Sequence, residues 1–119
     1  MPEAQVSMNV RKASEKVSLI DVEGELTAFA EDVLMDAYNQ ASDGHVRAII
    51  LNFEEVDYIN STGIALIVGL LAKARASHKR LLACNLSEHY VEIFEITRLS
   101  DFISVLPDEE SAIADASVS

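Results

Sequence analysis

The sequence predicts an α/β domain in which helices pack against a mixed sheet. From residue 28 onwards, helical segments alternate with short segments rich in Val, Ile and Leu, in the order α-β-β-α-β-α-β-α. Two strand-like segments precede this alternation with only a polar turn between them, which predicts a hairpin. Strands joined through helices imply right-handed crossovers, so a mainly parallel or mixed sheet is expected.

Length and composition favour one soluble domain. The 119 residues are enough for a single core and too few for two independent domains. Half of the residues are hydrophobic, yet no apolar run approaches the ~20 residues needed to span a bilayer. Residues 1–11 lack the basic start and apolar stretch of a signal peptide. We therefore expect one domain over 1–119, with its core over about 6–106, in the cytoplasm.

The first elements follow from composition and periodicity. The predicted elements are strands over 6–13 and 17–22, a helix over 28–41, strands over 45–53 and 56–59, a helix over 62–77, a strand over 80–86, a helix over 88–97, a strand over 102–105 and a short acidic helix over 108–117. The helix over 28–41 presents one apolar face, formed by Phe29, Val33, Leu34 and Ala37. The nearly continuous apolar run within 45–53 is typical of a central strand that is covered on both faces.

The second half is dominated by the helix over 62–77. Its predicted buried stripe has helical spacing and consists of Ile64, Ile67, Val68 and Leu71. Leu66 and Leu70 lie off this stripe, and small residues form a flank beside it. Either neighbouring elements sandwich the helix, or part of it is an exposed docking surface. The C-terminal helix carries acidic residues in its first turn, where the helix dipole favours them.

Charge and motifs exclude several function classes. The formal net charge of −11 repels nucleic-acid phosphates and anionic membranes, whereas a partner with a basic surface is compatible with it. The sequence contains no nucleotide-binding glycine motif and no G-x-S-x-G motif. We expect neither an enzyme nor a cofactor. Cys84, the single cysteine, is interpreted as a small buried hydrophobe.

No metal site is expected either. His45, His78 and His89 are widely separated and lack ligand spacing with Cys84, so they are interpreted as surface or boundary residues. Two acidic groups could collect a divalent cation through carboxylate oxygens. These are Asp21, Glu23 and Glu25 on one strand, and Glu54, Glu55 and Asp57 before the next. Solvated charge at strand ends is the favoured interpretation of both groups, because neither has a recognised loop geometry.

The most informative segment is residues 57–64, DYINSTGI, at a strand-to-helix junction. The carboxyl ends of strands in α/β sheets face a crevice where ligands and partners bind. Asn60 or Ser61 could be the N-cap of the following helix. A phosphate on Ser61 would lie beside unpaired helix N–H groups, so the fold should tolerate it. Its ~1.5–2 negative charges would block a partner that docks tightly there.

At these residues the chain resembles the STAS domain family, which includes bacterial anti-sigma factor antagonists. The resemblance extends over nearly the whole chain. It is carried by the segments GEL (24–26), IILNF (49–53), VDYINSTG (56–63), the helix that follows, and TRLSDFI (97–103). It implies a mixed sheet of four or five strands, with about four helices packed against one side of it.

The resemblance also implies a function. In similar proteins a serine in this position is phosphorylated by an anti-sigma factor that is also a serine kinase. Ser61 occupies that position and is the expected phosphorylation site, and Thr62 is the less favoured alternative. The unmodified protein would bind the anti-sigma factor, the phosphorylated protein would release it, and a protein phosphatase would reset the switch. The expected partner surface comprises Thr27, Asn60, Ser61, Thr62, Gly63 and Ile64.

The chain departs from the family pattern at two positions. Asn60 stands where an aspartate usually precedes the serine, and Thr27 stands where an aspartate commonly follows the earlier Gly-x-Leu segment. The loss of two negative charges would ease phosphate accommodation, but it could also remove contacts that a kinase uses to orient the hydroxyl.

Two alternative functions remain open. The same fold could serve as a constitutive, non-phosphorylated subunit of a larger assembly, such as the STAS-like component of a lipid-transport ABC system. Alternatively, the crevice beside Ser61 and Thr62 could belong to a small enzyme or ligand-binding protein. No base lies within recognisable motif spacing of Ser61, which disfavours the enzyme.

Overall fold

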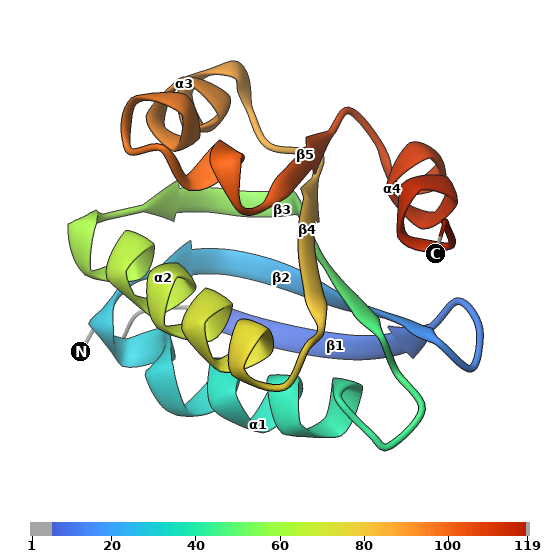
Figure 1. Cartoon of the computed structure of the whole chain (residues 1–119). Helices are drawn as coiled ribbons and strands as arrows, with labels where there is room; N and C mark the ends of the chain where they lie inside the picture. The colour runs from blue at the N-terminus through green and yellow to red at the C-terminus, as the bar shows by residue number, and fades with distance from the viewer. Residues whose placement is uncertain (1–5, 119) are drawn as a thin grey trace.

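A computed structural model describes residues 6–118 of the chain. The elements in order are β1 (Val6–Lys12), β2 (Val17–Leu26), a 3-10 turn (Ala28–Ala30), α1 (Glu31–Ala41), β3 (Ala48–Ile59), α2 (Ser61–Ala76), β4 (Arg80–Cys84), α3 (Glu88–Ile96), a second 3-10 turn (Leu99–Asp101), β5 (Ser104–Leu106) and α4 (Glu109–Ala116). They form one sheet with helices on both faces (Figure 1). No helix of this part of the chain is long and apolar enough to cross a membrane.

The sheet has five strands in the order β1-β2-β3-β4-β5. Strands β1 and β2 form an antiparallel hairpin, whereas β2, β3, β4 and β5 run parallel to one another. Residues 48–53 of the middle strand β3 are all buried, as predicted for a strand covered on both faces. The predicted α/β class and mixed sheet are therefore confirmed.

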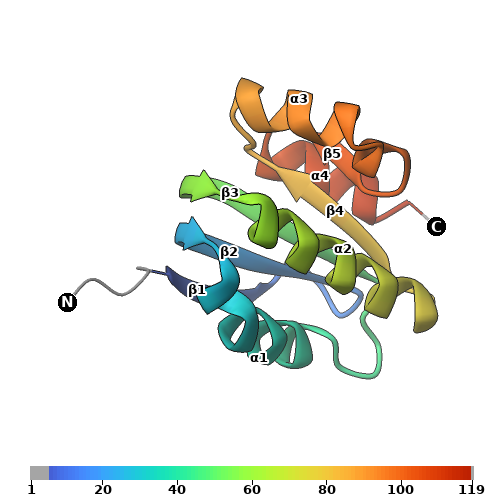
Figure 2. The same cartoon turned by 90° about the vertical axis from the view of Figure 1, so that its left-hand side faces the viewer.

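Two apolar clusters lie on opposite faces of the sheet. Alternating side chains Ile49 and Leu51 join the larger cluster with α1, α2 and α3. The intervening side chains Ala48 and Ile50 join a smaller cluster, which Ala112 of α4 covers. Figure 2 shows α1, α2 and α3 in front of the sheet and α4 behind it. The expectation that the helices cover one side was therefore wrong, because α4 crosses to the other face.

The predicted strands over 45–53 and 56–59 are one continuous strand, β3. Glu54 and Glu55 look like a break in the sequence, but both side chains are exposed and the backbone continues to pair with β2. The pairing register shifts between Asp21 and Glu23 and again after Gly24, and each time the extra residue lies on β3, as in a β-bulge. The result is a long strand that carries the chain directly to Asn60.

Two predicted apolar faces are also partly wrong. Phe29 lies in the 3-10 turn before α1 and is 78% exposed, so it does not belong to that helix's buried face. In α2 the buried side includes Leu70, whereas Val68 is 46% exposed. Because α2 is apolar on most sides, helical periodicity was compatible with two neighbouring buried faces. Packing against the sheet buries the face that contains Leu70.

A polar network ties α4 to the hairpin. The Arg11 guanidinium donates to both carboxylate oxygens of Asp21, at 2.6 and 2.7 Å, and to both of Glu109, at 2.7 and 3.1 Å. Asn52 Nδ2 donates to Asp21 Oδ1 at 2.9 Å. The hydrogen bonds from Arg11 lower the pKa of the Asp21 carboxyl below its ordinary value. Arg11 therefore joins β1, β2 and α4 through one side chain.

We predict that Arg11→Ala lowers the free energy of unfolding by about 1–2 kcal/mol at neutral pH, since two part-buried carboxylates lose their partner. The pKa of Asp21 in the folded protein lies below its ordinary value of 3.8. The ion pair of Asp21 with Arg11 therefore stabilises the folded state above that pH, and this stabilisation is lost as the pH falls through the folded pKa. Urea denaturation should show the difference from wild type shrinking as the pH falls below 3.8. Lys12→Ala, which removes an exposed pair with Asp43, should change stability by less than about 0.5 kcal/mol. A difference for Arg11→Ala that is independent of pH would contradict this account.

Candidate functional site

The ends of two neighbouring strands build the candidate site. Leu26 ends β2 and pairs in register with Ile59, which ends β3. Thr27 and Asn60 therefore leave the sheet side by side, and the Asn60 N–H donates to the Leu26 carbonyl oxygen at 3.3 Å. Figure 2 shows these strand ends beside the first turn of α2. The structure thus brings together residues that are far apart in the sequence and that we expected to form one surface.

Asn60 is the N-cap of α2. Its backbone is extended, and its side-chain oxygen accepts a hydrogen bond from the Gly63 N–H at 2.8 Å. The sequence left the cap open between Asn60 and Ser61, and the structure assigns it to Asn60. Ser61 is the first residue of the helix and is exposed, and its hydroxyl has no hydrogen-bond partner within residues 6–118. The cap therefore leaves the Ser61 hydroxyl available.

The other predicted surface residues surround this hydroxyl. Thr62 is exposed and follows Ser61 on α2. Ile64 is half-buried, and its N–H donates to the Asn60 carbonyl oxygen at 3.0 Å. Thr27 Oγ1 accepts a hydrogen bond from the Phe29 N–H at 3.3 Å, which caps the 3-10 turn. This turn lies against α2, and its Phe29 side chain is exposed.

Gly63 allows the helix to approach the end of β2. A Cβ atom at this position would lie 2.0 Å from the Leu26 carbonyl oxygen and 2.8 Å from its carbonyl carbon. Real Cβ atoms do not come so close to a backbone carbonyl, so any side chain at residue 63 would push α2 away from the sheet. Gly63 is therefore a packing residue of the site and not a contact residue, because it is buried.

We predict that Gly63→Ala lowers the free energy of unfolding by about 1–3 kcal/mol, because the added methyl group overpacks against the Leu26 backbone. Gly69→Ala, in the same helix, is the matched control. A Cβ at residue 69 would meet nothing within 4 Å, so this variant should gain about 0.5–1 kcal/mol from helix propensity. Chemical denaturation of both variants tests the prediction, and equal stability of the two would contradict it.

Helix α3 supports the end of β3 from the other side. The Tyr90 hydroxyl accepts a hydrogen bond from the Ile59 N–H at 2.8 Å and donates to the Ile59 carbonyl oxygen at 3.4 Å. Between α2 and α3 lies a hollow of about 320 Å³, lined by Ile59, Asn60, Ser61, Ile64, His89, Tyr90, Ile93 and Thr97. Tyr90 was not predicted from the sequence, because a hydroxyl within an amphipathic helix gives no signal of a contact 31 residues away.

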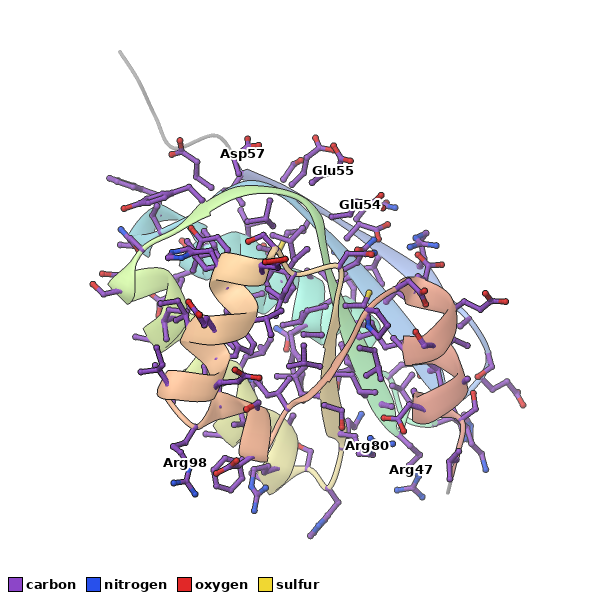
Figure 3. All side chains as sticks on the ribbon, turned by 90° about the horizontal axis from the view of Figure 1, so that it is seen from above. Arg47, Glu54, Glu55, Asp57, Arg80 and Arg98 are labelled. Carbon is purple, nitrogen blue, oxygen red and sulfur yellow. The ribbon has the colours of Figure 1, made fainter. Side chains whose placement is uncertain are left out.

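The exposed side of α2 beside Ser61 is uncharged, and exposed acidic residues lie on the strand that leads to it. The exposed side of α2 continues from Ser61 through the small or apolar residues Ala65, Val68, Gly69 and Ala72. This exposure favours the docking-surface interpretation of the small-residue flank. Glu54, Glu55 and Asp57 are exposed on the second half of β3 and lie together in Figure 3. A partner with a basic surface would complement this end of the molecule.

Within residues 6–118, the groups that could support catalysis or metal binding are not brought together. His89 lines the same hollow as Ser61, yet within residues 6–118 the Ser61 hydroxyl makes no hydrogen bond to a base. No group of three His, Cys, Asp or Glu side chains among these residues is placed to hold a metal ion. Cys84 is buried, as predicted, and burial raises the pKa of its thiol to about 12. Its thiol is therefore not a nucleophile near neutral pH.

A model of the STAS domain matches residues 8–112. The chain therefore belongs to the STAS domain family. The anti-sigma-B factor antagonist of Staphylococcus aureus is 30% identical to it over 101 residues, which cover 84% of this chain and 94% of that protein. The corresponding protein of Listeria monocytogenes is 31% identical over 102 residues, covering 84% and 88%. The similarity thus spans most of both proteins.

Solved structures show the same fold at lower identity. An anti-sigma factor antagonist from Mycobacterium paratuberculosis has a TM-score of 0.79 at 15% identity, covering 94% of each chain. SpoIIAA in its unphosphorylated form has a TM-score of 0.67 at 22% identity, covering 92% of this chain and 96% of its own. The phosphorylated form of SpoIIAA from Bacillus has a TM-score of 0.66 at 24% identity, covering 92% and 98%. The predicted fold family is confirmed.

Proposed function

We propose that this chain is a cytoplasmic protein-interaction switch of the anti-sigma factor antagonist type. In its unmodified form it binds an anti-sigma factor that has serine kinase activity. Phosphorylation of Ser61 releases that partner, and a protein phosphatase restores binding. The chain itself performs no catalysis and binds no nucleic acid.

One observation carries the proposal: Asn60 supplies the N-cap of α2, so the hydroxyl of the next residue, Ser61, is exposed and free of hydrogen bonds to residues 6–118. A kinase needs an accessible hydroxyl. The helix N-terminus also favours a phosphate, because its first N–H groups lack intrahelical acceptors and carry the positive end of the dipole. The fold can therefore carry both the unmodified and the phosphorylated serine.

The relatives support the identity of the partner. Curated proteins that share about 30% of their residues with this chain over most of their length are anti-sigma-B factor antagonists. The fold is also that of SpoIIAA, which has been solved in unphosphorylated and phosphorylated forms. Partner switching through Ser61 agrees both with these relatives and with the exposed position of the serine.

The surface explains how a single phosphate would act. The exposed face of α2 beside Ser61 is uncharged, and the exposed Phe29 ring adds apolar area that a partner can bury. Within this uncharged part of the interface a doubly charged phosphate would be desolvated unpaired, because the basic groups of a partner would face the acidic residues of β3 instead. Release therefore requires no change of fold. It requires only a charge at the edge of the docking surface.

Asn60 stands where the family usually has aspartate, and its amide oxygen caps the helix. It removes one negative charge directly beside Ser61. Thr27 likewise caps its own turn without a charge. Both substitutions favour the phosphorylated state by removing repulsion from the added phosphate.

We predict that Ser61→Asp weakens binding to the anti-sigma factor by at least about 100-fold, because an unpaired charge in an interface costs about 3 kcal/mol or more. Ser61→Ala should bind like wild type but should not be released by kinase and ATP. The experiment is affinity capture from a lysate of the native host with each variant, followed by calorimetric titration of the captured anti-sigma factor.

Ser14→Asp is the matched control. Ser14 is exposed in the hairpin between β1 and β2, at the opposite end of the sheet, so the same charge placed there should leave binding unchanged. All variants should melt like wild type. Undiminished binding by Ser61→Asp would overturn the proposal. Capture of an ABC ATPase without any kinase would instead support the constitutive-subunit function.

A further inference from the structure

A second site lies at the opposite end of the sheet, where the parallel strands β2, β3 and β4 begin. There the C-terminal end of α4 and the hairpin turn enclose a hollow of about 840 Å³. Its lining includes Val17, Ala48 and Ala116, which belong to the smaller apolar cluster, and the exposed Val118. This volume lies within the range of ~300–1,000 Å³ that is typical of small-molecule sites.

Basic side chains gather around this hollow although the chain as a whole is acidic. Lys16, Arg47 and Arg80 line it, which is three of the nine Lys and Arg residues in the sequence. Glu15 is the one acidic side chain in its lining, and it is exposed. Figure 3 shows Arg47 and Arg80 together, far from Glu54, Glu55 and Asp57. The lining of this hollow is therefore basic, although the formal net charge of the chain is −11.

The two arginines differ in how they are held. Arg80 donates to the Asp115 carboxylate and to the Asp115 carbonyl oxygen, both at 2.9 Å, so α4 fixes its position. The Arg47 guanidinium has no hydrogen-bond or ion-pair partner within residues 6–118, whereas its carbonyl oxygen accepts from the Arg80 N–H at 2.8 Å. The backbone thus places Arg47 beside a fixed arginine and leaves its five donors available for an anion.

His78 adds a donor from an unusual backbone position. It follows α2 with a φ of 59°, and the Lys79 N–H donates to the Ala74 carbonyl oxygen at 2.8 Å. This left-handed position after a helix ordinarily favours glycine or asparagine. Here it is occupied by a histidine that lines the hollow.

From these contacts we infer that the hollow between the hairpin turn and α4 binds a small amphiphilic anion, with a carboxylate or phosphate head beside Arg47 and an aliphatic body against the apolar lining. The head pairs with the free Arg47 guanidinium and with the His78 ring. The body packs against Ala116, Val118 and the methylene groups of the basic side chains. This site is independent of Ser61 and of the proposed switch.

Titration of the purified chain with decanoate and with decyl phosphate tests the inference, followed by calorimetry and two-dimensional amide NMR. We expect saturable binding with shifts centred on Lys16, Ala48, His78 and Val118. Arg47→Gln should weaken binding at least about tenfold, because it removes a charge-assisted hydrogen bond. Arg98→Gln removes the same charge at a distant, exposed position and should leave binding unchanged.

The comparison probes separate the alternatives. Decanol has the aliphatic body without the anionic head, and inorganic phosphate has the anionic head without the body. Both should therefore bind much more weakly than decanoate. Equal binding by Arg47→Gln and Arg98→Gln, or equal binding of decanol and decanoate, would overturn the inference. Binding to phosphatidylglycerol vesicles without binding of either free amphiphile would assign this end of the protein to a membrane surface instead. Thermal melts of both variants confirm that the variants are folded.

Discussion

The close approach of helix α2 to the carbonyl oxygen of Leu26 is the constraint on which the candidate site depends. Only a residue without a side chain fits at position 63, so the first turn of α2 rests directly on the end of β2. The hydrogen bonds of Tyr90 hold the end of β3 from the side of α3. Two strand ends and two helices therefore position one short junction, and Ser61 is presented by packed elements and not by a free loop.

Within that junction, one residue caps the helix and the adjacent residue carries the hydroxyl proposed for regulation. Asn60 provides the hydrogen bond that begins the helix, and Ser61 provides an exposed hydroxyl that the fold does not use. A modification of Ser61 can therefore change the surface without removing a stabilising contact. This separation suits a switch whose two states share one fold. The hollow at the other end of the sheet is remote from the junction, so the two ends of the domain can serve different ligands.

Much of the fold could be predicted from the sequence because hydrophobic periodicity and turn residues report local structure directly. The hairpin, the central strand and the start of α2 near Asn60 followed from such local signals. The errors arose where tertiary packing decided the outcome. Exposed glutamates did not interrupt β3, since bulges in β3 accommodated the extra residues while its pairing with β2 continued. Packing selected Leu70 over Val68 as a core residue, left Phe29 exposed and carried α4 to the second face. The same distinction applies to the site. The sequence offered two candidates for the N-cap of α2, Asn60 and Ser61, because capping is local. It gave no sign of the Tyr90 contact, because that contact joins elements that are distant in the sequence.

Intact-mass spectrometry of the protein from its native host, with fragmentation to locate any modification, tests the central claim most directly. The account predicts a fraction of molecules that carry one phosphate on Ser61, and a change of that fraction with growth condition. Absence of phosphate from Ser61 under every growth condition would contradict the switch and favour a constitutive STAS subunit.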